Sequence, residues 1–417
     1  MAGVSEATAA ATATAPPRGR ARDVALLATA MAMLYVMVQV YAGAGPATLV
    51  AVTGVRLLAG MAPALIFGVS SVAALTAGRA MDRWGRVPVI AAGFALGACG
   101  AALTAAGLWR DSAVLVVLGF LVVGAANGTA FMCRVAAADL YPPERRARAM
   151  ASVMMGAVAG ALLGPLVLMP LVGRGLDRGT LATAWLVAGG AMIAGCFLVT
   201  RVRSGRAPAA AGGAQPRRTA ARALLRRPGA ARALLAAAAS LGVMVAAMSL
   251  IGHAMTGMGH HGEDVFPVLS AHFIGMFAFM IPVGIAVDRI GHVRGMIIGL
   301  LVLGASVGSL AALESARAIA IALFSLGLGW NVAFVGATTR LAALTDASER
   351  GTLFGVNDAV SGLSAALLAL GGGAVLPRFG LPGLALALAA IVAIAVSVVA
   401  FAREAALTSS RDDASRV

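Results

Sequence analysis

A charged turn, Gly78-Arg79-Ala80-Met81-Asp82-Arg83-Trp84-Gly85-Arg86, joins two long apolar runs. Each run has about 20 apolar residues, the length that a helix needs to cross the hydrocarbon core of a bilayer. The same pattern, G-x-x-x-D-R-x-G-[R/H], returns at Gly284-Ile285-Ala286-Val287-Asp288-Arg289-Ile290-Gly291-His292. The two aspartates are 288 − 82 = 206 residues apart, about half of the 417-residue chain, which indicates two repeated halves.

Other residues repeat at the same offset. Asn127 and Asn331 lie in corresponding apolar runs, 331 − 127 = 204 residues apart. Each of these runs is followed by an acidic–basic pair, Glu144-Arg145 and Glu349-Arg350, with an offset of 349 − 144 = 205 residues. The agreement predicts a duplicated membrane protein built from two parallel halves, with a binding site between them.

The repeated turn resembles the loop between helices 2 and 3 of the major facilitator superfamily of secondary transporters, which often carries a weaker copy between helices 8 and 9. The resemblance covers nearly the whole chain. It implies an all-α membrane protein with twelve transmembrane helices in two pseudo-symmetric six-helix bundles, which transports by alternating access. We expect five segments: a disordered cytoplasmic tail, an N-terminal bundle, a basic cytoplasmic linker, a C-terminal bundle and a second cytoplasmic tail, at 1–22, 23–202, 203–231, 232–403 and 404–417.

Composition and charge agree with a membrane protein. Hydrophobic residues make up 60% of the chain and only 12% is charged, far from the usual balance of soluble domains. The net charge of +15 comes from 32 basic residues, all arginine, which cluster in alternate loops. This alternation follows the positive-inside rule and predicts that both termini lie in the cytoplasm. Nucleic-acid binding is therefore a poor explanation of the charge.

No enzyme signature is present. The sequence has no P-loop, no helical H-E-x-x-H and no G-x-S-x-G, so neither ATP hydrolysis nor a standard hydrolase is indicated, and we expect no cofactor. The three cysteines lie in apolar runs without C-x-x-C spacing and are interpreted as small core residues. The loop with His260, His261, Glu263 and Asp264 could bind a metal ion, but a solvated loop is the simpler interpretation, and we expect no metal.

We expect the two repeated turns to act as a gate. Gly78 would let its helix pack closely, and Asp82 could cap the start of a neighbouring helix, which in the resembling family is helix 11. Arg86 is placed to pair with Asp139 at the end of helix 4. Such a cluster would latch the two halves together; ordinary loop charge is the alternative. The expected gate comprises Gly78, Asp82, Arg83, Gly85, Arg86, Asp139, Gly284, Asp288, Arg289 and Gly291.

Two further groups are expected inside the bundles. In the fifth expected helix, 149–172, small residues at every fourth position would allow close helix contact. They resemble an antiporter-associated motif, whose final glycine pair is replaced here by Leu168-Met169. The residues of this motif are Gly156, Gly160, Gly164 and Pro165. Helices 1, 4, 7 and 10 line the cavity in the resembling family, and amides and aromatic rings suit a neutral or amphiphilic ligand. The expected cavity residues are Tyr35, Gln39, Asn127, Trp330 and Asn331.

Charged and titratable residues inside the spans are candidates for ion coupling, because buried charge in a membrane is costly and usually marks a partner or a pathway. Asp358 could pair with Arg340 or His272 and carry a proton; a purely structural pair is the alternative. The arginines could instead snorkel to the interface, and the histidines could be packed hydrogen-bonding residues. The candidates are Asp358, Arg340, His272, His253 and Arg134.

The segment from Gly329-Trp330-Asn331 to Gly355-Val356-Asn357-Asp358 looks like that of bacterial drug and metabolite efflux permeases. We therefore expect a monomeric transporter in the bacterial plasma membrane that exports a small amphiphilic molecule in exchange for protons. The alternatives are a proton-linked uptake permease for a small polar metabolite and a membrane receptor that does not transport.

Topology can be tested by labelling. In a variant without Cys99, Cys133 and Cys196, single cysteines at Ser204 and Ser410 should react with an impermeant thiol reagent only after permeabilisation, because both segments are predicted to be cytoplasmic. Labelling at either site in intact, correctly oriented cells would contradict this topology.

The gate can be tested by removing its capping charge. Asp82→Asn should abolish transport at near-normal abundance, since one carboxylate stabilises one end state of a two-state machine. Asp288→Asn should be milder, because the second copy has His292 where the first has Arg86. Transport by Asp82→Asn at the wild-type rate would refute the latch.

Overall fold

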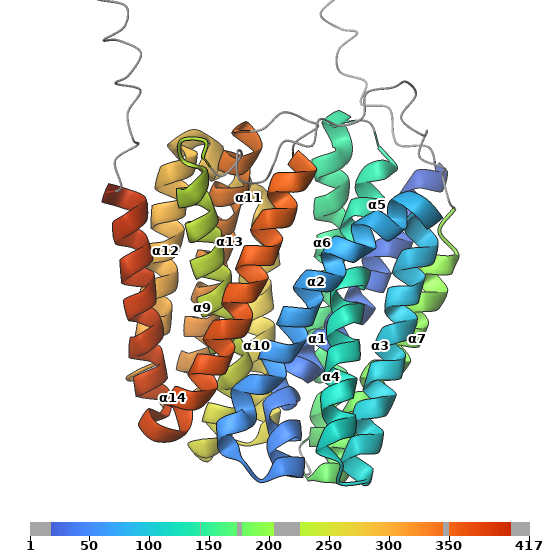
Figure 1. Ribbon diagram of the computed structural model, residues 1–417, viewed down its shortest axis with the longest axis vertical. Helices are drawn as coiled ribbons and strands as arrows, with labels where there is room; N and C mark the ends of the chain where they lie inside the picture. Colours follow the sequence, from blue (N-terminus) through green and yellow to red (C-terminus); the bar gives the residue numbers. More distant parts are fainter. Residues whose placement is uncertain (1–17, 142, 173–176, 204–225, 345–349, 402–417) are drawn as a thin grey trace, which may run out of the picture.

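The structure is a computed structural model that describes residues 18–141, 143–172, 177–203, 226–344 and 350–401. Within these ranges every regular element is a helix (Figure 1). The elements are α1 (Arg18–Thr53), the 3-10 helix η1 (Arg56–Gly60), α2 (Met61–Trp84), α3 (Arg86–Trp109), α4 (Ala113–Ala130), α5 (Cys133–Asp139), α6 (Pro143–Val172), α7 (Arg178–Thr200), α9 (Ala230–Gly257), α10 (Gly262–Phe277), α11 (Met280–Ile290), α12 (His292–Ser309), α13 (Ala316–Ala343) and α14 (Arg350–Phe401).

The expected twelve spans are accounted for. Ten helices of the described chain are long and apolar enough to cross a membrane, and the bent pair α10–α11 adds an eleventh span. The 52-residue α14 is two helices that meet at Gly380, whose φ of 63° and ψ of −169° are not helical. Figure 1 shows its two arms as a hairpin. The ten helices, the bent pair and the second arm of α14 together make twelve spans. Helices suit this setting, because each satisfies its own backbone hydrogen bonds where water is absent.

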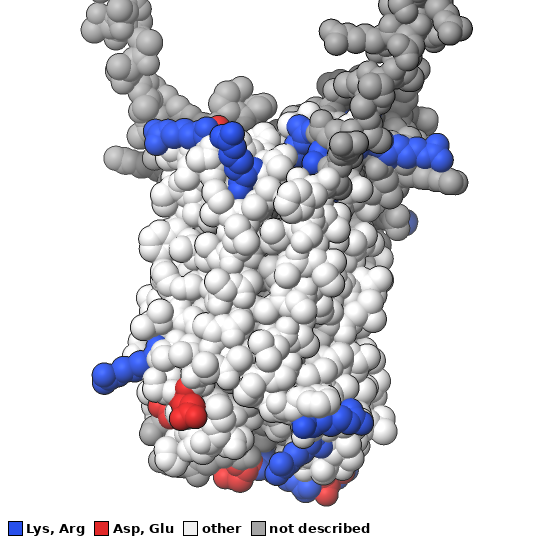
Figure 2. Space-filling model, turned by 90° about the vertical axis from the view of Figure 1, so that its left-hand side faces the viewer, with Lys and Arg blue, Asp and Glu red and all other residues white. Residues whose placement is uncertain are grey.

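The helices form two bundles with the same internal packing. In the first half α3 packs against α4 and α7, and in the second half α12 packs against α13 and α14. The halves meet where α2 contacts α14, α6 contacts α10, and α1 contacts α9. Charged side chains on the face seen in Figure 2 gather towards its two ends, with an uncharged zone between them. This arrangement is that of a protein embedded in a bilayer.

Helix packing within the first half rests on small residues. A Cβ atom added at Gly156 would meet the carbonyl oxygen of Ala28 and lie 3.1 Å from Cβ of Met31. One at Gly160 would lie 2.7 Å from Cβ of Tyr35, one helical turn further along α1. The stripe of glycines on α6 therefore brings its backbone against the backbone of α1, as close packing between helices in a membrane requires.

The halves are closed at one end and apart at the other. At the closed end a Cβ at Gly60 would lie 2.7 Å from Cα of Gly373 and collide with the carbonyl oxygen of Ala369. At the other end of α2, nothing described lies within 4 Å of such an atom at Gly78. In Figure 1, α2 and the first arm of α14 lie side by side near the bottom and diverge towards the top, the end where α14 finishes.

The span formed by α10 and α11 is broken. The two helices are bent by 45° at Ala278-Phe279. Pro282 explains the break, because proline has no N–H to donate to the carbonyl group four residues earlier, that of Ala278, and its ring clashes with that group. Backbone bonding to the first helix continues on one side of the break, where the amide of Ala278 donates to Ile274 over 2.9 Å.

The expected segment boundaries need two corrections. The tail expected over 1–22 is shorter, because α1 already begins at Arg18; arginine and alanine are strong helix formers and extend the first helix. The second bundle begins at Ala230, inside the expected linker. Most of the linker and the C-terminal tail lie outside the described residues.

The closed end of α2 yields a matched pair of tests. Gly60→Ala should destabilise this conformation by about 1–3 kcal/mol, since the new methyl group collides with the backbone of α14. Gly68→Ala is the control: Gly68 lies in α2, which begins directly after Gly60, and its added Cβ would make an ordinary 3.7 Å contact with Ala366. We expect a lower melting temperature in detergent and slower transport for Gly60→Ala only. Equal behaviour of the two variants would contradict the close contact.

Candidate functional site

The first copy of the repeated turn holds two helices in place. Nε of Arg86 donates to Oδ2 of Asp139 over 2.8 Å, the pair expected from the sequence, and both side chains are partly exposed. Gly85 ends α2 with φ 91° and Gly291 ends α11 with φ 92°. Only glycine adopts this backbone conformation readily, so the second glycine of each copy is required by the turn itself.

The first glycine of each copy behaves differently. Close packing was expected at Gly78, yet nothing described lies within 4 Å of a Cβ built there or at Gly284. One turn before Gly78, Leu75 still approaches α14, where a Cβ built at Gly355 would lie 3.3 Å from its Cδ2. Asp288 and Arg289 are exposed. The side chain of Asp82 lies outside the described part, and Arg83 lies over the ring of Trp84, 5.7 Å from its centroid.

Gln39 of α1 links the two halves. Its Nε2 donates to the carbonyl oxygen of Ala161 in α6 over 2.9 Å and to Oγ of Ser270 in α10 over 2.8 Å. Gln39 is fully buried, and an added Cβ at Gly164 would lie 2.7 Å from its side chain. The glycine stripe of α6, followed by Pro165 within the same helix, thus leaves room for this amide. Sequence reasoning missed Ser270, since a single serine in an apolar run gives no signal.

Aromatic rings continue this contact into the second half. Tyr35, one turn before Gln39, meets the rings of Phe273 and Phe277 edge to face, with centroids 5.4 and 5.3 Å away. Phe277 in turn lies 6.1 Å from the ring of Trp330. Trp330 stacks on Phe334 at 4.8 Å. The two phenylalanines of α10 were not predicted, because apolar residues in a buried helix have no distinguishing periodicity.

Several polar atoms beside these rings have no partner. Within the described chain, Nε1 of Trp330, Oε1 of Gln39 and both amide atoms of Asn331 are buried without a hydrogen bond. Leaving such a group unpaired costs about 1–3 kcal/mol. Asn127, the counterpart of Asn331, is different: its Nδ2 donates to Oγ of Ser70 over 3.1 Å. Of the two asparagines among the expected cavity residues, Asn127 is therefore hydrogen-bonded and Asn331 is not.

A charged contact also joins the halves. Nη2 of Arg134 in α5 lies 3.9 Å from Oδ2 of Asp358 in α14. The guanidinium group of Arg134 lies over the ring of Phe131, 4.2 Å from its centroid. Arg340 or His272 was expected as the partner of Asp358, whereas its carboxylate contacts Arg134 of the opposite half. These parts of α5 and α14 are neighbours only in the folded protein, so sequence spacing could not reveal this pair. The guanidinium group of Arg340 lies against Gly229 at the start of α9.

The histidines occupy distinct environments. His272 is fully buried, and its Nδ1 lies 2.8 Å from the carbonyl oxygen of Leu323 in α13, so Nδ1 carries the proton. His253 is half-buried in α9. In the loop before α10, Nε2 of His260 lies 2.6 Å from the carbonyl oxygen of Glu314, and His261 caps α10. Within the described residues no three His, Cys, Asp or Glu side chains are grouped as a metal site.

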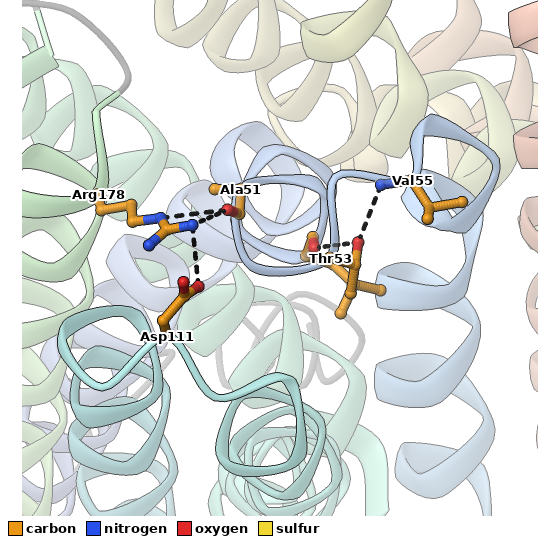
Figure 3. A network of polar contacts seen from close by, with 6 residues as sticks. Ala51, Thr53, Val55, Asp111 and Arg178 are labelled. Atoms are coloured by element: carbon orange, nitrogen blue, oxygen red, sulfur yellow. Dashed lines mark hydrogen bonds and ion pairs between the residues drawn. The ribbon is translucent and has the colours of Figure 1, made fainter.

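The closed end of the first half has its own polar network (Figure 3). Arg178, at the start of α7, points between α1 and the α3–α4 turn: its Nη2 lies 2.9 Å from the carbonyl oxygen of Ala51 and 2.9 Å from Oδ1 of Asp111. The neighbouring Asp177 caps α7 by accepting from the amide of Thr180 over 2.9 Å, and this bond lowers the pKa of its carboxyl group. The network holds helices of one half together and takes no part in the contact between the halves.

Comparisons with known proteins agree with this architecture. The family model described as Major Facilitator Superfamily matches residues 24–266 and 251–416. The uncharacterized MFS-type transporter YdeG of Bacillus subtilis is 29% identical over 350 residues, covering 78% of this chain and 81% of that protein. The riboflavin transporter RfnT of Brucella anthropi is 27% identical over 291 residues, covering 67% of this chain and 70% of that protein.

Two solved structures share the fold. The xylose transporter XylE of E. coli, in a partially occluded inward open conformation, superposes with a TM-score of 0.70 at 13% identity, covering 93% of this chain and 99% of that one. An inward-facing, occupied bacterial homolog of the human lysosomal transporter Spinster also has a TM-score of 0.70, at 14% identity, covering 92% and 97% of the two chains. With the family model spanning nearly all described residues, the twelve spans and the repeated turn have one explanation: this chain is a membrane transporter that belongs to the major facilitator superfamily.

Proposed function

We propose that the protein exports small amphiphilic molecules across the plasma membrane in exchange for protons, working as a monomer. The observation that carries the coupling is the contact of Arg134 with Asp358, one from each half. A secondary transporter needs a group whose charge changes the balance between two arrangements of its halves. An acid that touches an arginine of the opposite half is suited to that task.

The orientation follows from charge. Arginines gather at the end where the chain enters α1 and leaves α14, so the positive-inside rule favours that end as cytoplasmic. The halves are in close contact at Gly60, and α2 diverges from the first arm of α14 towards the other end (Figure 1), which supports an inward-facing conformation. The repeated turns, the expected gate, lie at the open end.

The contact of Arg134 with Asp358 sets the direction in which protons move in this proposal. At 3.9 Å the pair of Arg134 and Asp358 is loose, and closure of the cytoplasmic end would bring its members closer. An ionised Asp358 therefore favours the outward-facing state, and a protonated Asp358 favours the inward-facing state. Protons taken up outside would return the carrier inwards and leave on the cytoplasmic side, while substrate moves outwards with Asp358 ionised. This cycle is that of a proton antiporter.

Uptake of a small polar metabolite is the second candidate. It is favoured by the name of one relative, the riboflavin transporter of Brucella anthropi, which aligns over 67% of this chain. Accumulation of a compound panel in cells with and without the protein distinguishes the two directions. Lower accumulation in expressing cells supports export, and higher accumulation supports uptake.

Coupling can be tested in everted vesicles with an imposed pH gradient. Asp358→Asn should remove the gradient dependence of transport and leave substrate binding detectable, because the amide cannot carry the proton. Asp111→Asn is the matched control: this acid pairs with Arg178 inside one half at the opposite end, and its gradient dependence should match wild type.

Two other outcomes revise the proposal. If Asp358→Asn keeps gradient-driven transport and His272→Gln loses it, the coupling site moves to α10. If both variants keep it, proton antiport at either site is refuted.

A further inference from the structure

The rings between the two halves form a continuous aromatic wall. Tyr35 belongs to the first half, and Phe273, Phe277 and Trp330 belong to the second. The edge-to-face contacts run from α1 through α10 to α13 at centroid distances of 5.3 to 6.1 Å. These rings are 1–6% exposed, and edge-to-face or stacked packing is the environment that another aromatic ring favours.

The unpaired polar groups beside the wall are donors and acceptors without charge. Nε1 of Trp330 and Nδ2 of Asn331 are donors, while Oδ1 of Asn331 and Oε1 of Gln39 are acceptors, and all four atoms are buried without a partner. Asn331 is fully buried and Trp330 is 6% exposed. A ligand that pairs with them must itself present both donors and acceptors. An amide or imide edge does so.

Asn331 lies at the break in the α10–α11 span. A Cβ at Gly327 would lie 3.0 Å from the backbone nitrogen of Met276, so this face of α13 packs against α10. Asn331 follows one helical turn later on the same face, about 6 Å further along the axis. It therefore reaches the level of Ala278-Phe279, where Pro282 cannot supply the usual backbone donor. Interrupted helices in transporters commonly mark the bound substrate.

Charged ligands fit this environment poorly. Aromatic rings can hold a cation, but the unpaired indole and amide N–H groups would point positive hydrogens at it. An anion would compete with Asp358: the guanidinium group of Arg134, which acts electrostatically on Tyr35, already lies over Phe131 and 3.9 Å from the carboxylate of Asp358. Flat and uncharged molecules match both the rings and the unpaired groups.

We propose that the substrate is a flat, uncharged heteroaromatic molecule with amide-type N–H and C=O groups on one edge, held by the rings of Tyr35, Phe277 and Trp330 and by the amide of Asn331. This proposal rests on the proposed transport function and narrows it. In transport, the ligand would bridge both halves, because Tyr35 and Trp330 come from opposite ones.

Binding to the purified full-length protein tests the proposal by equilibrium dialysis with three flat probes. Riboflavin is uncharged and has an imide edge, riboflavin 5′-phosphate has the same ring with negative charge, and ethidium is a flat cation. We expect riboflavin to bind at least about tenfold more tightly than either charged probe. Equal binding of all three, or preference for a charged probe, would overturn the uncharged class.

Asn331→Leu separates recognition from folding. Replacing an unpaired buried amide by an apolar group of similar size should maintain or raise the melting temperature while lowering riboflavin affinity about tenfold. Ser306→Ala is the control, because Ser306 is buried in the same half and donates within its own helix to Val302 over 2.7 Å; it should leave affinity unchanged. Unchanged affinity in Asn331→Leu refutes the assignment. If that variant does not fold, Asn331→Gln and Trp330→Phe supply the same comparison, with an expected loss of at least about threefold in each.

Transport measured in parallel keeps the two proposals apart. Gradient-driven movement of another compound, without riboflavin binding, overturns the substrate class and retains the exporter. Binding of riboflavin that depends on Asn331, without movement of any compound, supports the binding site and overturns transport.

Discussion

Direct contact between helix backbones at glycine is the interaction on which this structure depends. Lipid supplies little hydrophobic drive for helix association, so helices in a bilayer are held by close packing and by hydrogen bonds. The chain has 52 glycines, and those on α6 bring it against α1, where an added Cβ at Gly160 would lie 2.7 Å from Cβ of Tyr35. The same device at Gly60 and Gly373 closes the two halves at one end. Two helices whose backbones touch with no side chains between them can separate and come together again as rigid bodies.

The polar contacts that the structure describes between the halves differ in character. Gln39 bonds to α6 and α10 through one side of its amide and leaves the other side unpaired. Arg134 and Asp358 form a loose charged contact nearer the open end. Buried unpaired groups are costly, and a protein retains them where a ligand or a second conformation supplies the partner. We therefore propose that function is concentrated at the surface where the halves meet, and that the interior of each bundle, such as the Arg178 network, serves rigidity.

Much of the fold could be predicted from the sequence because it repeats. The offsets of Asp82 and Asp288 and of Asn127 and Asn331 predicted two halves, and the apolar runs predicted twelve spans. The pair of Arg86 and Asp139 could also be predicted, since the turn and the end of helix 4 must lie at the same membrane surface. These features depend on position along the chain and on which end of a helix a residue occupies.

The remaining site could not be predicted, because it depends on how helices rotate against one another. Phe273, Phe277 and Ser270 lie in a span that is apolar on every side, so no periodicity distinguished their roles. The break of this span at Ala278-Phe279 was missed although Pro282 was visible, since proline is tolerated in many membrane helices. Arg340 or His272 was expected beside Asp358, and the contact with Arg134 was not foreseen for the same reason: Arg134 and Arg340 occupy equivalent positions of the two halves, and the fold brings Arg134 of α5 to α14.

Alternating access of two rigid halves is the central claim, and paired distance measurements by electron paramagnetic resonance test it most directly. One pair of spin labels would replace the exposed Trp84 and Arg294 at the open end, and a second pair would replace the exposed Trp109 and Arg317 at the closed end. On changing pH or adding a transported compound, the first distance should shorten while the second lengthens, in the same fraction of molecules. Distances that stay fixed at both ends, or that change in the same direction, would contradict the account.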